Sequence, residues 1–332
     1  MATYYGTYGQ KVQYLASDPS DPQIGQVWYN STSAVLKVRG VSTTGTFVSG
    51  GNMNTARSSV AGAGTQTAAL GFSGNAGGVI QSSSESYNGT SWTNTPSLNT
   101  TRTGAGSIGI QTAAIAAGGE NTGYISQTES WNGSSWTALS SPSNVGTARG
   151  QASGCGIQTA GLLAGGVTTD TVATTESWNG STWTSKPNMN SIKQNSACVG
   201  TNTAALVFGG IKIPGGTPVL NDTESFNGTS WTTLNTLNTA RRGLGGGGVQ
   251  TLAVAFGGSQ NPPVVSSTEL WNGTSWTSNP TGLATARTGL GCFGTQAASL
   301  AAAGNNAAGS DVATTEEFNG PGTASTRTVT VS

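Results

Sequence analysis

The chain has 332 residues, of which 51 are glycine, and its 13 basic residues balance its 13 acidic residues. Charged residues make up only 8% of the sequence, so no surface for nucleic acid or anionic lipid is expected. Histidine is absent and the three cysteines lack zinc-site spacing, which argues against a hydrolase triad, a metal site and a disulfide framework.

Residues 1–44 form a segment that does not share the repeat found in the rest of the chain. Neither a basic region nor a long apolar run follows Met1, so we expect no signal peptide, no membrane insertion and synthesis in a cytoplasm. A Pro-rich turn leads into an apolar run around Trp28 and Tyr29, and a polar turn separates it from Val35 to Val38. This pattern predicts a small N-terminal β-hairpin module.

From residue 45 onward, the chain repeats a unit of 44 to 48 residues in six copies. The copies align on a basic residue, and an amide side chain stands nine residues later in every copy. A constant interval of this kind indicates a constant backbone. The six basic residues are Arg57, Arg102, Arg149, Lys193, Arg241 and Arg287.

Each copy is predicted to hold four short strands: a Gly-rich strand, an apolar strand ending in Gly-Gly, a strand with a glutamate, and a strand that begins at a tryptophan. Asn-Gly before the fourth strand predicts a two-residue hairpin turn with two positive φ angles. That turn would place each glutamate opposite the tryptophan seven residues later. The glutamates are Glu85, Glu129, Glu176, Glu224, Glu269 and Glu316, and the tryptophans are Trp92, Trp136, Trp183, Trp231 and Trp276.

The basic residues and the glutamates account for nearly half of all charges in the chain. A carboxylate on the same strand face as two aromatic rings must be paired, because an isolated buried charge is costly. We therefore expect one structural ion pair or carboxylate hydrogen-bond network in each copy.

Four strands in about 46 residues are typical of one blade of a β-propeller. Six copies predict an all-β, six-bladed propeller over residues 45–332; a β-solenoid, which usually repeats in fewer residues, is the alternative. The last copy lacks its tryptophan, while Phe47 precedes Arg57 at the matching interval. The strand around Phe47 is thus expected to pair with the last blade and close the ring, and the alternating tail from Thr328 could compete for or extend that edge.

The connections on one face of the predicted ring vary in length, whereas those on the other face are constant. Loop variation on a constant scaffold is how repeat proteins carry recognition, although unselected surface is the alternative. The longest connections are 211–220, 259–265 and 140–146. The candidate binding residues on them are Lys212, Ile213, Pro214, Thr217, Val219, Gln260, Asn261, Val264, Ser143 and Asn144.

The repeat resembles the kelch repeat, because Gly165-Gly166 ends the second strand and Trp178 precedes Trp183 by about one turn. Thr-Glu-Ser-Trp-Asn-Gly followed by Trp-Thr, together with Thr-Ala-Arg, is similar to the kelch-like repeats in virion proteins of tailed phages. Residues 18–37 are similar to segments near the front of phage tail-fibre and other virion appendage proteins. The second resemblance implies attachment to the particle through this module, with Trp28 and Tyr29 as candidate contacts.

These resemblances imply a non-enzymatic virion component, since no acid, base, nucleophile or metal cluster stands out from the repeat. The expected role is receptor binding or surface decoration, with the variable loops presented to host-surface glycans. Residues 1–44 would bind other virion proteins, and the chain would be a homo-oligomer or present in many copies without a cofactor. A purely structural or self-assembling virion protein is the alternative.

Overall fold

The computed structural model describes residues 12–41, 44–213, 218–322 and 324–329, and these residues form strands and no helix. The all-β prediction is therefore confirmed. The chain divides into two compact units. We call Thr46–Asn319 the repeat unit, and Met1–Gly45 with Gly320–Ser332 the terminal unit.

The repeat unit contains four-stranded antiparallel sheets, one for each copy of the sequence repeat. The strands of the first three sheets are β5 (Ala61–Gly64), β6 (Ala69–Phe72), β9 (Ser84–Tyr87) and β10 (Trp92–Thr95); β11 (Gly106–Ile110), β12 (Ala113–Ala117), β13 (Thr128–Trp131) and β14 (Trp136–Ala138); and β15 (Ser153–Ile157), β16 (Ala160–Ala164), β17 (Thr175–Trp178) and β18 (Trp183–Lys186). Those of the last three are β19 (Ala197–Thr201), β20 (Ala204–Phe208), β21 (Thr223–Phe226) and β22 (Trp231–Leu234); β23 (Gly245–Val249), β24 (Leu252–Phe256), β25 (Thr268–Trp271) and β26 (Trp276–Asn279); and β28 (Gly291–Gly294), β29 (Ala298–Ala302), β31 (Thr315–Asn319) and β4 (Thr46–Gly50). Two further pairs join β7 (Asn75–Ala76) to β8 (Val79–Ile80) and β27 (Arg287–Thr288) to β30 (Asn305–Asn306).

The hairpin between the third and fourth strands differs from the predicted two-residue turn. In the first repeat the loop runs from Asn88 to Ser91, and only Gly89 in it has a positive φ, at 89°. The Asn88 side chain caps the loop, because its Oδ1 accepts hydrogen bonds from the backbone N–H groups of the second and third residues after it. The longer loop shifts the pairing, so Trp92 lies opposite Tyr87 rather than opposite Glu85. The glutamate and both aromatic residues still share one strand face, because the shift is by two residues.

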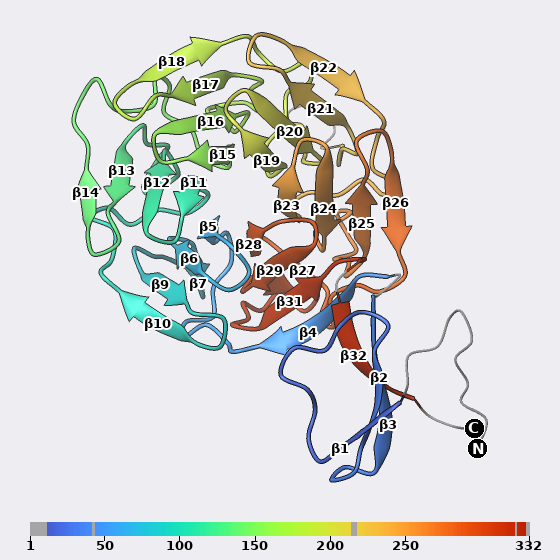
Figure 1. The fold of residues 1–332 in the computed structure, drawn as a ribbon. Coiled ribbons are helices and arrows are strands. Elements are labelled where there is room, and N and C mark those ends of the chain that lie inside the picture. Colours follow the sequence, from blue (N-terminus) through green and yellow to red (C-terminus); the bar gives the residue numbers. More distant parts are fainter. Residues whose placement is uncertain (1–11, 42–43, 214–217, 323, 330–332) are drawn as a thin grey trace, which may run out of the picture. The chain divides into compact units, whose positions relative to one another are not determined.

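The sheets stand around a common centre, with the first strand of each sheet innermost (Figure 1). Neighbouring first strands approach so closely that a Cβ on Gly154 would lie 2.4 Å from the carbonyl oxygen of Ser107. Glycine is therefore required at this position by the backbone of the next sheet.

Backbone hydrogen bonds join each sheet to the next at the Gly-Gly end of its second strand. The N–H of the second glycine position donates to the carbonyl of the basic residue in the following repeat, and the last repeat donates to the first in the same way. The six bonds run from Gly74 to Arg102, Gly119 to Arg149, Gly166 to Lys193, Gly210 to Arg241, Gly258 to Arg287 and Gly304 to Arg57.

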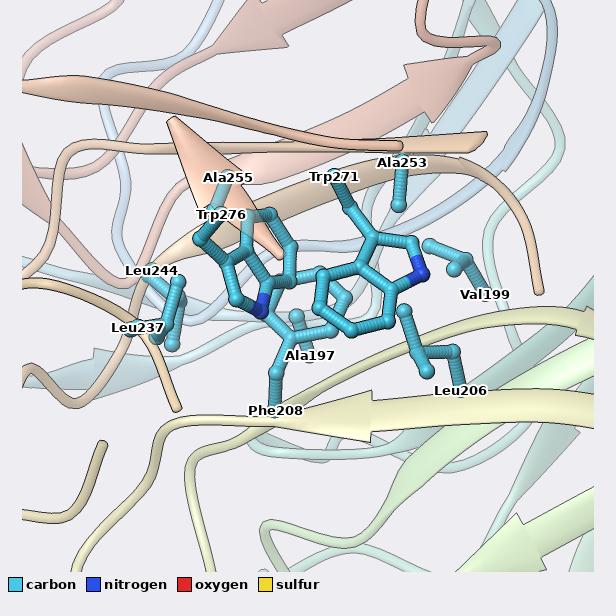
Figure 2. Close-up of a cluster of buried hydrophobic side chains, with 10 residues drawn as sticks. All are labelled: Ala197, Val199, Leu206, Phe208, Leu237, Leu244, Ala253, Ala255, Trp271 and Trp276. Atoms are coloured by element: carbon cyan, nitrogen blue, oxygen red, sulfur yellow. The ribbon is translucent and has the colours of Figure 1, made fainter. Parts of the chain in front are cut away.

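The hydrophobic core is divided into clusters that each lie between two adjacent sheets. Figure 2 shows the cluster between the fourth and fifth repeats, in which the indoles of Trp271 and Trp276 pack beside each other. The ring of Phe208 from the preceding sheet lies 4.8 Å from that of Trp276, centre to centre. A corresponding cluster joins the last repeat to the first, with Phe293 against Trp92. The aromatic residues that recur in every repeat thus pack between neighbouring sheets and do not fill one common centre.

The outer strand of the last sheet comes from the start of the repeat unit. β4 pairs with β31 in antiparallel register, and Phe47 lies directly opposite Phe318. The ring of Phe47 also packs edge-on against Phe256 of the fifth repeat. This is the pairing that the missing tryptophan of the last copy predicts.

The terminal unit is a four-stranded sheet in the order β1 (Gln13–Leu15), β2 (Val27–Asn30), β3 (Val35–Val41) and β32 (Ala324–Val329). β2 and β3 form the predicted hairpin. The prediction that the propeller runs to residue 332 is wrong at its C-terminal end, because β32 pairs with β3 instead of with the last repeat. An alternating tail suits either edge, and the edge of the last sheet is already taken by β4.

Candidate functional site

The repeat unit has two groups of charged residues. We call the six basic residues and the six glutamates of the sequence repeat the framework charges, and the others are surface charges. Each framework glutamate contacts the basic residue of its own repeat, and all twelve side chains are at most 6% exposed. In the fifth repeat, Arg241 Nη2 lies 2.8 Å from Glu269 Oε1. Burial lowers the pKa of this arginine, and the Glu269 carboxylate opposes that effect. Each pair lies within its own repeat, and in the fourth repeat Lys193 Nζ also lies 3.6 Å from Asp222 Oδ2.

A backbone N–H three residues before the basic residue completes each carboxylate site. Asn99 N donates to Glu129 Oε2 at 2.8 Å, and Asn238 N donates to Glu269 Oε2 at 2.7 Å. The other four repeats have the same bond, donated by Asn54, Gly146, Asn190 and Ala284. The carboxylate therefore fixes the connection between the preceding sheet and the basic residue in every repeat.

A second layer of short bridges lies beyond the Gly-Gly end of the sheets. In each repeat, the residue that follows the basic residue forms a β-bridge with the residue that follows the second glycine position, as Thr103 does with Glu120. The latter residue forms a second bridge with the chain that returns from the loop, as Glu120 does with Tyr124. We call this surface the loop face. It comprises the residue after each basic residue and the segments 75–80, 120–124, 167–171, 211–219, 259–264 and 305–311.

The loop face is built on constant bridges but differs in every repeat. Between three and seven residues separate the two bridge partners of a segment, with the longest stretch in the fourth repeat. The repeat unit has eight charged residues outside the framework pairs, and five of them lie on this face: Glu120, Asp170, Lys212, Arg242 and Asp311. Acidic residues thus belong to the second, third and sixth repeats, and basic residues to the fourth and fifth.

The predicted residues of the fourth repeat lie on the loop face. Lys212 and Ile213 are exposed, and the backbones of Ile213 and Thr171 of the third repeat are joined by a hydrogen bond from Thr171 N to Ile213 O. The Thr171 hydroxyl accepts a bond from Ile213 N in return. Val219 is half-buried and pairs with Ile211. Pro214 and Thr217 lie outside the described residues.

The fifth-repeat residues also lie on this face. Gln260 and Asn261 are exposed at the loop tip, and Val264 pairs with Ser259. The amide oxygen of Asn261 accepts a hydrogen bond from Arg242 Nη2. Sequence reasoning did not select Arg242, although its place directly after the framework arginine was a signal for it.

Ser143 and Asn144 lie in the connection between the second and third sheets and are half-buried. Asn144 Oδ1 accepts a hydrogen bond from the N–H of Thr128, and Ser143 N donates to Ser140 O. Asn144 therefore holds its own loop in place, and it does not join the bridges of the loop face.

One group of polar residues that sequence reasoning missed lies where the first and last repeats meet. Ser58, Asn75, Asn305, Ser310 and Asp311 line a pocket of about 500 Å³ there. Asn75 and Asp311 are 236 positions apart, so no local pattern brings them together. The pocket forms only because the first and last repeats lie side by side in space.

The only aromatic residue on the described part of the loop face is Tyr124 in the second repeat. Its side chain is 36% exposed, and its ring lies over Gly150 of the third repeat. Burial, and to a smaller extent Glu120, raise the pKa of Tyr124.

In the terminal unit, the predicted contact residue Trp28 is completely buried. Its Nε1 donates to Asp18 Oδ1 at 3.0 Å, and Asp18 also accepts bonds from Asn30 and Lys37. Trp28 is thus a core residue of the unit and is unable to serve as an attachment contact. Tyr29 is half-buried and stacks on Tyr14, which is 76% exposed.

No family model and no curated protein sequence matches the chain. Within the described ranges, no helix is long and apolar enough to span a membrane.

Proposed function

We propose that the repeat unit is a closed, six-bladed, kelch-like β-propeller. Four contacts between the last and first repeats support closure: Gly304 N to Arg57 O, Gln66 Nε2 to Phe318 O, Trp92 Nε1 to Thr315 Oγ1, and Tyr87 Oη to Glu317 Oε1. Bonds equivalent to the first three also join other pairs of neighbouring sheets. The fourth bond occurs only at this junction among the described residues. A solenoid would leave its first and last coils apart.

On this scaffold, we propose a non-enzymatic bacteriophage virion protein, such as a tail-fibre or decoration protein, that binds receptors on the host surface through the loop face. The observation that carries the proposal is the placement of the charges. Framework charges are buried as one corresponding basic–acidic pair in every repeat, whereas most of the remaining charges of the repeat unit are on the loop face and differ between repeats. Their neighbours are mainly Ser, Thr, Asn and backbone groups, which suit the hydroxyl groups of a glycan.

The test is binding of the full chain, displayed in many copies, to a panel of bacterial cells and to a glycan array. Multivalent display is needed because weak single sites act by avidity on a particle. We expect replacement of residues 211–219 by the shorter segment 167–171 to change or abolish the binding. Ile157→Thr, which changes an exposed residue away from the loop face to the residue found in three other repeats, should leave it unchanged. Absence of binding to every cell and glycan would contradict receptor binding.

The second candidate is a purely structural virion protein that assembles through the terminal unit. Its support is the exposure of Tyr14 on β1 and of Ile24 in the turn before β2, which are 76% and 63% accessible. In this case the full chain would bind other virion proteins, and Tyr14→Ser with Ile24→Ser would prevent that binding without affecting cell or glycan binding. Trp28 variants would be uninformative, because they disrupt the core of the unit.

A further inference from the structure

The pocket between the first and last repeats has the chemistry of a ligand site. It lies on the loop face, and its volume of about 500 Å³ falls within the range of roughly 300 to 1,000 Å³ for small-molecule sites. Its walls carry one carboxylate, two carboxamides, two hydroxyls and the backbone of glycines, with Ala56 as the only apolar side chain. An apolar ligand would therefore bury its surface against polar groups, which disfavours it.

The carboxylate of Asp311 is held at the pocket wall by both neighbouring repeats. Oδ2 accepts a hydrogen bond from Gly77 N of the first repeat at 2.9 Å, and Oδ1 accepts one from Asn305 Nδ2 at 3.3 Å. A carboxylate offers about four lone-pair sites, so these two bonds leave acceptor capacity for a ligand. The bonds also orient the carboxylate before any ligand arrives, which lowers the entropic cost of binding.

The framework does not require an acid at position 311. The bridge residues at the corresponding position of the other five repeats are Ile80, Tyr124, Thr171, Val219 and Val264. These repeats make the same bridge without a carboxylate, so the charge at Asp311 is an addition to the scaffold. At the tip of the opposite wall, a Cβ on Gly77 would meet no atom within 4 Å, so this side of the pocket is open.

We propose that this pocket binds one neutral hexose unit, with Asp311 accepting hydrogen bonds from ligand hydroxyls and the amides of Asn75 and Asn305 serving as polar partners. The single negative charge disfavours anionic sugars. A single carboxylate also supplies little charge for a calcium ion, whose affinity depends on the number of charged ligands, and the described residues contain no group of three or more His, Cys, Asp or Glu side chains that could hold a metal ion. This inference rests on the proposed glycan binding and assigns one site to it.

The experiment is titration of the full chain, in buffer containing EDTA, with methyl glycosides of glucose, galactose, mannose and N-acetylglucosamine, followed by saturation-transfer NMR and calorimetry. We expect at least one of these neutral glycosides to bind. Ser310→Trp places a bulky ring in the pocket at an exposed position, and Asp311→Ala removes the acceptor. Each should weaken binding at least tenfold.

Ile157→Thr, at an exposed position away from the loop face, is the matched control and should bind like the wild type. Equal melting temperatures of the Ser310→Trp variant and the wild type would show that the fold is intact. The pocket proposal is overturned if no neutral glycoside binds, or if Ser310→Trp binds as well as the wild type. If Ser310→Trp still binds cells and the glycan array as the wild type does, this assignment fails while receptor binding stands. If the array and cells show no binding, the proposed function fails by its own test.

Discussion

At the scale of single residues, we expect the largest loss of stability where one partner of a buried ion pair is removed. Arg102 and Glu129 are both completely buried, and burial lowers the pKa of the arginine despite the nearby carboxylate. Glu129→Ala leaves an uncompensated buried cation, and we expect it to lower the free energy of unfolding by about 3–5 kcal/mol. Urea denaturation of the full chain measures this effect.

The matched control replaces both partners by apolar residues of similar size, Arg102→Met with Glu129→Leu. Because a buried pair often contributes little net stability beyond such a replacement, the double variant should recover most of the loss. An unchanged urea midpoint for Glu129→Ala would show that the pair does not constrain the sheet.

A second residue-scale prediction concerns the pH dependence of the terminal unit. Hydrogen bonds from Lys37, then Asn30 and Trp28, lower the pKa of Asp18 from 3.8 to about 2. A lowered carboxyl pKa stabilises the folded state above its unfolded value, and this stabilisation is lost as the pH falls from about 4 to about 2. The indole N–H signal of Trp28 in NMR spectra reports on this contact. Asp18→Asn should destabilise the unit most at pH 5 and much less near pH 2, where about half of the folded carboxyl groups are protonated. A constant difference over this range would contradict the prediction.

At the scale of elements, the amide nine residues after the basic residue joins one sheet to the preceding sheet by hydrogen bonds in five of the six repeats, and we call this pair of bonds the latch. Gln111 Nε2 donates to Ala69 O and Tyr87 O, and the glutamines of four other repeats make the equivalent pair of bonds. The fourth repeat has Asn202, which is one methylene shorter and makes no such bond in the described part of the chain. The junction between the third and fourth repeats therefore lacks a latch.

Asn202→Gln should supply the missing latch to the carbonyls of Gly161 and Trp178, the positions that correspond to Ala69 and Tyr87. A net gain of about 0.5–1.5 kcal/mol is expected, because two neutral bonds form but a longer side chain is ordered. Thermal and urea denaturation measure it. The reciprocal variant Gln158→Asn should lose a similar amount, and a destabilised Asn202→Gln would mean that the junction has no room for the longer side chain.

The sequence predicted these elements well where they depend on spacing within one repeat. Constant intervals located the strands, the framework charges and the strand around Phe47. The hairpin register was predicted wrongly, because Asn-Gly is compatible with both a two-residue turn and the capped four-residue loop that starts at Asn88. The position of β32 and the pocket around Asp311 depend on contacts between segments far apart in the sequence, and a local pattern carries no information on them.

At the scale of the whole molecule, the proposed closure of the ring makes the junction of the last and first repeats equivalent to the internal junctions. Gln66 Nε2 donates across that junction to Ser299 O and Phe318 O, as Gln111 does between the first and second repeats. In a closed, cooperative ring, Gln66→Ala and Gln111→Ala should each cost about 1–3 kcal/mol, because each leaves buried carbonyl groups without their partner. Urea denaturation of the two variants side by side measures both costs.

The comparison separates a closed ring from an open stack of sheets, since an open stack keeps its internal latches but has none between its ends. If Gln111→Ala lowers the free energy of unfolding and Gln66→Ala does not, the first and last repeats are apart in solution. In that case the pocket lined by Asn75 and Asp311 would not form, and the loop face would be an arc with separate ends. Equal costs would mean that the first and last repeats present one continuous surface, so a ligand could contact loops from both ends of the chain at once.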